Sequence, residues 1–130
     1  MEIESRDGLL FVSLTLTHAG GMETIRDLVL DTGAAQSIID LSAVRKLDMS
    51  STREDEFVFM AGIGGRESAL RKRIDHLQFD SYHMENTHLD FAYLDAHPGI
   101  NGLLGSDILM GGRFVIDLDR MEVYRRQLLL

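Results

Sequence analysis

The stretch Leu28-Val29-Leu30-Asp31-Thr32-Gly33-Ala34 decides the fold assignment of this chain. Three apolar residues lead directly into an aspartate, and Gly33 permits the tight turn that has to follow. A buried strand that ends in such a turn presents one carboxylate to a cleft. The tripeptide Asp-Thr-Gly occurs once. If the chemistry needs two carboxylates, the second must come from another copy of the chain.

Length and composition predict one globular domain spanning residues 1–130. Hydrophobic residues make up 45% of the chain and charged residues 26%, which are ordinary values for a folded domain. No apolar stretch approaches the roughly 20 residues that a membrane-spanning helix needs. The charged N-terminal segment, residues 1–7, is not a signal peptide as it stands. A removed leader, an anchor or a larger parent protein stays open.

The net charge and the absence of cysteine exclude several classes of function. There are 13 Lys and Arg residues against 21 Asp and Glu residues, a formal charge of −8. This charge repels nucleic acid and anionic membranes, so neither is an expected partner. With no cysteine, disulfides, thiol catalysis and cysteine-zinc sites are all excluded. A reducing compartment fits this composition, and we expect the cytoplasm.

Alternating apolar and polar residues predict a mainly β chain. The expected strands are residues 8–17, 24–30, 36–39, 57–60, a return strand through Ile74 and Leu77 to Phe79, 87–95, and a last hairpin of 114–117 with 121–124. Two short helices are predicted: one capped by Asp40 and running to Leu47, and one at 106–110. Residues 48–56 are polar and acidic and are interpreted as a surface loop.

Three motifs, in a fixed order, resemble the retropepsin-like aspartic proteases. They are Asp31-Thr32-Gly33-Ala34 after an apolar strand, Gly62-Ile63-Gly64-Gly65 at a hairpin tip, and residues 102–109, Gly-Leu-Leu-Gly-Ser-Asp-Ile-Leu, before the last strands. Each motif is weak alone, but their order and spacing make coincidence improbable. The resemblance covers nearly the whole chain, from about Leu9 to Tyr124. It implies an all-β, closed, six-stranded barrel-like fold with one or two short helices.

The resemblance also implies an activity, hydrolysis of peptide bonds by a homodimer with one active site. Asp31, Thr32 and Gly33 would be the catalytic residues. An extended polypeptide would bind along Ala34 and Ala35 and beneath a mobile flap, Gly62-Ile63-Gly64-Gly65, that closes over it. Leu103 and Leu104 are interpreted as core residues beneath the Asp31 loop, and Gly105 as the residue that lets that loop pass closely. No metal or cofactor is implied.

The chemistry of such a pair of carboxylates follows from electrostatics. Two Asp31 side chains about 3 Å apart across a twofold axis repel each other by roughly 5 kcal/mol at an effective dielectric constant near 20. They therefore share one proton near neutral pH. The ionised carboxylate takes a proton from a water held between them, and the protonated one donates a hydrogen bond to the scissile carbonyl. The water attacks directly, without a covalent intermediate.

The chain departs from the retroviral pattern at one pair of positions. Retroviral members follow Asp-Thr-Gly-Ala with a carboxylate that pairs with an arginine in the last helix, and these places hold Ala35 and Ser106 here. Dimer strength and substrate preference are therefore expected to differ from the viral enzymes. An alternative function stays open, a non-catalytic dimeric binding or scaffold module that keeps the fold. The apolar tail Leu128-Leu129-Leu130 is a candidate for closing the dimer.

Other patterns in the sequence carry weaker signals. The glycine-rich turn at 62–65 lacks the third glycine of a dinucleotide fingerprint and the Gly-Lys-Ser/Thr of a P-loop, so nucleotide binding is not favoured. Strand alternation places Arg71 and Arg73 on one face and Lys72 on the other, as a solvated surface. His83 and His88 are expected on opposite faces of one strand, which argues against a metal site. Asp117 and Asp119 are interpreted as turn carboxylates.

Overall fold

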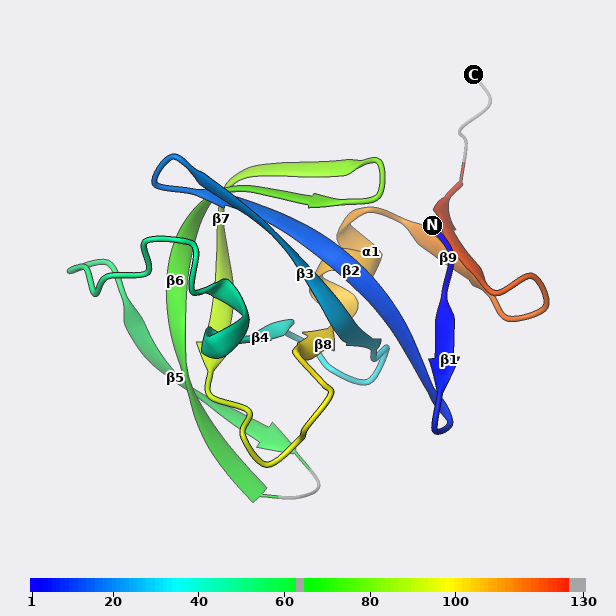
Figure 1. Ribbon diagram of the computed structural model, residues 1–130, viewed down its shortest axis with the longest axis horizontal. Coiled ribbons are helices and arrows are strands. Elements are labelled where there is room, and N and C mark those ends of the chain that lie inside the picture. The colour runs from blue at the N-terminus through cyan, green and yellow to red at the C-terminus, as the bar shows by residue number, and fades with distance from the viewer. Residues whose placement is uncertain (63–64, 127–130) are drawn as a thin grey trace.

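The computed structural model describes residues 1–62 and 65–126, and within 60–67 only the backbone pairing is described. The fold is mainly β, as predicted, and six strands of one sheet form a closed ring (Figure 1). The ring closes because β6 pairs with β2 as well as with β7. In order around it come β2 (Leu9–His18), β3 (Gly21–Leu30), β8 (Gly102–Leu104), β4 (Ile38–Asp40), β7 (Tyr82–Ala92) and β6 (Gly65–Phe79).

The remaining elements extend or cover this ring. β1 (Glu4–Arg6) pairs with β2, and β5 (Glu56–Gly62) pairs with β6 as an edge strand. A 3-10 helix, η1 (Leu41–Val44), follows β4, and a short helix, α1 (Ser106–Gly111), follows β8. β9 (Phe114–Asp117) and β10 (Glu122–Arg125) form a separate hairpin. No helix in the described ranges is long and apolar enough to span a membrane.

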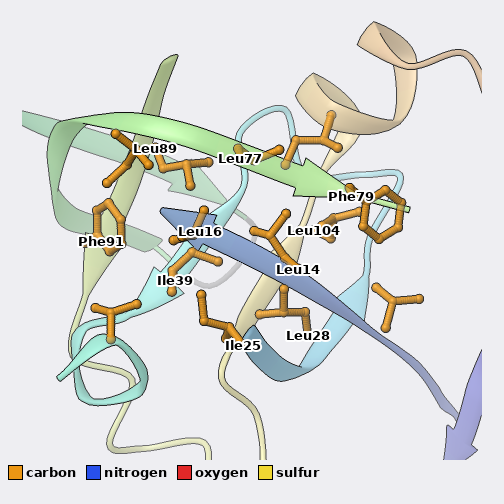
Figure 2. Close-up of a cluster of buried hydrophobic side chains, with 14 of the residues drawn as sticks. Leu14, Leu16, Ile25, Leu28, Ile39, Leu77, Phe79, Leu89, Phe91 and Leu104 are labelled. Atoms are coloured by element: carbon orange, nitrogen blue, oxygen red, sulfur yellow. The ribbon is translucent and has the colours of Figure 1, made fainter. Parts of the chain in front are cut away.

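The core fills the inside of the ring (Figure 2). Leu14 and Leu16 from β2 face Leu28 from β3 and Ile39 from β4, and each is at most 1% exposed. Phe79, Phe91 and Leu104 are fully buried. Because side chains of a strand alternate between its faces, the residue next to each of these core positions lies on the outer face. This alternation decides which residues are available to a site.

The N-terminus is tied to the end of its own chain. The Ile3 amide donates to the Met121 carbonyl at 2.9 Å, and the Val123 amide donates to the Met1 carbonyl at 2.9 Å. The predicted tail, Leu128 to Leu130, lies outside the described residues. Within the described part, the N-terminal segment therefore adds a third strand-like edge to the β9–β10 hairpin.

Two predicted elements have different bounds in the structure. The segment after Asp40 is a single 3-10 turn, although Asp40 caps it as expected by accepting from the Ser42 amide at 3.0 Å. The Leu47 amide donates to the Val44 carbonyl three residues back, which is the hydrogen-bond pattern of a 3-10 helix. Helices of this kind rarely run beyond three or four residues. β7 begins at Tyr82, five residues before the predicted strand, because the positive φ of Asn86 interrupts the alternation that would reveal it.

Lys72 is not a solvated residue, so that prediction is wrong. Arg71 and Lys72 do lie on opposite faces of β6, but Lys72 is 2% exposed. Its ammonium group forms a buried ion pair with Asp55 and donates to the Ser50 carbonyl at 3.3 Å. The polar segment 48–56 predicted as a surface loop is thereby anchored to the base of the β5–β6 hairpin.

Candidate active site

Asp31 lies where β3 ends, and its own loop holds it in place. Its amide donates to the Leu104 carbonyl at 3.0 Å, and the Ala34 amide donates back to the Asp31 carbonyl at 3.1 Å. Its carboxylate oxygen Oδ1 accepts the Gly33 amide at 3.0 Å. Asp31 is half-buried, whereas Thr32 and Gly33 are exposed. One carboxylate is thus oriented locally while lone pairs of both oxygens stay available for other partners.

β8 supports this loop from the side. It runs parallel to β3, with Val29 opposite Leu103 and Leu30 opposite Leu104. Leu104 is fully buried, as expected of a core residue. Leu103 is only half-buried and belongs to the other face of the strand, so the prediction that it is core is wrong. The Leu104 carbonyl, rather than a packed side chain of Leu103, fixes the Asp31 backbone.

The first residues of α1 hold the far side of the loop. The Ala34 carbonyl accepts both the Ser106 amide at 2.7 Å and the Ser106 hydroxyl at 3.2 Å. A Cβ on Gly105 would lie 2.5 Å from the same carbonyl oxygen, so only glycine permits this approach. The close passage predicted for Gly105 is confirmed. Ser106, which stands where the viral pattern has arginine, binds the loop by a different contact.

Ser37 and Asp107 make a second link between the loop and α1. The Ser37 hydroxyl donates to Asp107 Oδ1 at 2.7 Å, and the Ser37 amide donates to Oδ2 at 3.0 Å. The same hydroxyl accepts the Gly105 amide at 2.8 Å in a buried position. Ser37 is 1% exposed. These bonds clamp both ends of the segment from Ala34 to Ser37 onto α1.

On the outer face, one row of residues crosses the sheet from β3 to the β5–β6 hairpin. Each residue is the direct register partner of the next: Val29, Leu103, Ile38, Asp90, Arg71 and Glu56. The row is apolar near the Asp31 loop and charged beyond β4. Val29, Ile38 and Asp90 are buried, so the row links the Asp31 loop to the hairpin through the structure of the sheet.

Arg71 and Asp90 form the charged part of this row. Arg71 donates from Nε to Asp90 Oδ1 at 2.8 Å and from Nη2 to Oδ2 at 3.2 Å. Asp90 is 1% exposed, so its charge depends on this partner. The hydrogen bonds to Asp90, aided by the charges of Glu56 and Asp107, raise the pKa of Arg71 above its ordinary value. The guanidinium therefore stays charged at any pH at which the protein is folded.

The predicted flap is described only in part. β5 and β6 pair from Glu56 with Arg71 to Gly62 with Gly65, which confirms the hairpin. Ile63 and Gly64, between them, lie outside the described residues. Motion of this hairpin and its contacts with a ligand stay predictions.

The histidines of β7 share a face, which corrects the sequence-based expectation. Met84 and Leu89 point into the core, so His83 and His88 both lie on the outer face. The alternation reverses between them at Asn86, which has a positive φ of 51°, where the β6–β7 pairing is interrupted between Ile74–Thr87 and His76–Glu85 without a change of register. His83 Nδ1 lies 3.1 Å from His76 Nε2. Among residues 1–62 and 65–126, no three metal-binding side chains lie together.

Sequence reasoning located the Asp31 loop but missed the side chains that hold it. Ser37 and Asp107 are 70 residues apart, and neither residue type signals a partner. The pairing of Arg71 with Asp90 was equally invisible, because it depends on the register of β6 and β7. Asp117 was identified correctly: its carboxylate accepts the amides of Asp119 and Arg120 in the last turn.

Comparison with known proteins gave one family match. A family model described as aspartyl protease matches residues 14–108, which include the Asp31 loop and the first residues of α1. A comparison with curated proteins returned no match.

Proposed function

The chain belongs to the aspartyl protease family, and on that premise we propose that it is an endopeptidase whose catalytic pair is Asp31 from each of two chains. The observation that carries the proposal is the Asp31 loop itself. It presents a half-buried carboxylate between exposed neighbours and is fastened from behind by Leu104, Ser106 and the Ser37–Asp107 link. One chain offers one such carboxylate, and a water-activating pair needs two.

Two chains related by a twofold axis bring equivalent loops together. Thr32 and Gly33 are exposed in the single chain, so they are free to contact the partner's loop. In the proposed pair, one carboxylate is ionised and removes a proton from water, while the other is protonated and donates to the scissile carbonyl. The Gly33 amide, bound to Oδ1, holds each carboxylate in the orientation this exchange requires.

We propose that the polypeptide substrate lies extended between this pair and the β5–β6 hairpin. Ala34 and Ala35 follow the catalytic residues directly. The Ala34 amide and carbonyl are bound within the loop, so the exposed Ala35 offers the backbone for main-chain hydrogen bonds, and the small side chain of Ala34 lets the substrate approach. Gly62, Ile63, Gly64 and Gly65 would close over the bound chain and exclude water.

The experiment is digestion of an unfolded protein and of a peptide library between mildly acidic and neutral pH. Wild type should cleave both, and Asp31→Asn should lose at least about a thousandfold in rate, because the shared proton cannot be exchanged through an amide. Asp119→Asn, in an exposed turn, serves as the matched control and should behave as wild type. Equal cleavage by wild type and Asp31→Asn would refute the proposal. No cleavage by folded, dimeric wild type would favour a non-catalytic module.

A further inference from the structure

A cavity of about 250 Å³ lies beside the Asp31 loop, between α1 and the β6–β7 hairpin. Leu77, Leu89 and Ile108 line it on the core side, and each is at most 3% exposed. Gln36 and His88 are the exposed residues of its lining and mark its opening. The cavity therefore has an apolar inner side and polar lining residues, Gln36, Thr87, His88 and Asp107, and Gln36 places it where the chain leaves the candidate active site.

The position of Gln36 connects the cavity to the proposed substrate path. Gln36 directly follows Ala34 and Ala35 and lies five residues from Asp31, at most about 17 Å of extended chain. A substrate bound as an added strand advances by about 3.3 Å per residue. A side chain within about five residues of the cleaved bond can thus enter the cavity.

One half-buried lining residue of the cavity carries a negative charge. Asp107 is the one carboxylate among the lining residues. Each of its oxygens accepts one hydrogen bond from Ser37, which leaves further lone pairs for a cation. Among residues 1–59 and 68–126, whose side chains are described, no ion pair involves Asp107. Arg71 is paired with Asp90, although its charge also interacts with that of Asp107. The chain as a whole carries a charge of −8, which adds to the negative potential.

We propose that this cavity binds one lysine or arginine side chain of the polypeptide substrate. The inference rests on the proposed protease function and names a substrate class for it. The aliphatic stem packs against Leu77, Leu89 and Ile108, and the cationic end reaches Asp107. The volume is smaller than the roughly 300 Å³ at which pockets for whole small-molecule ligands begin, and it matches a single side chain.

The test compares peptides that carry lysine, norleucine or glutamate at each position around the cleaved bond. Wild type should favour lysine at one position by about tenfold in kcat/KM over glutamate, and less so at high salt because exposed charges are screened. Thr87→Phe, which fills the cavity from its lining, should abolish that preference by lowering cleavage of the lysine peptide to that of the glutamate peptide. Thr87→Lys should reverse the preference. Thr24→Phe, exposed on β3, is the control and should keep it.

A binding measurement separates this inference from the proposed function. Asp31→Asn protein is titrated into a fluorescently labelled lysine peptide, with and without Thr87→Phe, and anisotropy is recorded. If wild type cleaves no peptide, the proposed function fails, and tighter binding of the lysine peptide that Thr87→Phe abolishes still supports the cavity. If wild type cleaves lysine, norleucine and glutamate peptides equally at every position, the inference is overturned and the protease function stands.

Discussion

Replacing Ser37 by alanine removes the hydroxyl that links the Asp31 loop to α1. This hydroxyl donates to the Asp107 carboxylate at 2.7 Å and accepts the buried Gly105 amide at 2.8 Å. A hydrogen bond to a charged group contributes about 1.5 to 3 kcal/mol, and a buried amide left without an acceptor costs about 1 to 3 kcal/mol. Because the Ser37 amide still reaches Asp107 Oδ2, we expect a total loss of about 3 kcal/mol in the free energy of unfolding.

The assay is equilibrium unfolding in urea, followed by far-ultraviolet circular dichroism. Ser5→Ala, exposed on β1, is the matched control and should change the unfolding free energy by less than about 0.5 kcal/mol. Cleavage by Ser37→Ala under conditions where it is folded should also fall, mainly in kcat, because the loop that orients Asp31 loses one of its anchors. A Ser37→Ala protein as stable and as active as Ser5→Ala would refute the role assigned to this link.

Three further predictions concern contacts around the same site. Gly105→Ala should destabilise the fold by about 2 kcal/mol or more, because the added Cβ meets the Ala34 carbonyl at 2.5 Å; a thermal midpoint equal to wild type would contradict this. Lys72→Met should cost about 3 kcal/mol by leaving Asp55 buried without its partner, measured by urea unfolding, and a loss below about 0.5 kcal/mol would contradict it. Acid should weaken the same ion pair. Burial opposes ionisation of Asp55, but hydrogen bonds from Lys72 and Thr52 outweigh it and lower its pKa. Its contribution to stability is thus full above about pH 4 and is lost as the pH falls through the lowered value. The stability difference between wild type and Asp55→Asn should shrink as the pH falls below about 4, and a difference that stays constant down to the acid unfolding transition would exclude this assignment.

Local patterns were enough to predict most of the strands and the place of Asp31, whereas the closed ring was implied by the resemblance to the retropepsin-like proteases. The alternation in β2 and the apolar run before Asp31 arise because these strands bury side chains in the core. Such patterns can be read directly from the sequence. The helix after Asp40 was predicted too long because the structure forms only a short 3-10 helix there, and the start of β7 was missed because the positive φ of Asn86 interrupts the regular alternation. The burial of Lys72 could not be predicted, since it depends on Asp55 reaching it from a loop 17 residues away.

The contacts that hold the Asp31 loop in place could not be predicted from the sequence either. Ala35 and Ser106 indicate from the sequence that the viral carboxylate-arginine pair is absent. What replaces it, the contacts of Ser106 with Ala34 and of Ser37 with Asp107, spans about 70 residues and emerges only when β4, β8 and α1 are packed together. The departure from the viral pattern therefore changes how the loop is fastened and does not leave it unfastened.

The most direct test of the shared active site is subunit mixing. Wild type and Asp31→Asn are unfolded together in equal amounts and refolded, and the cleavage rate is compared with that of the same total amount of refolded wild type. If each active site needs Asp31 from both chains of a twofold dimer, random pairing leaves about one quarter of the wild-type rate. About one half of that rate would mean that each chain acts alone, and would contradict the account.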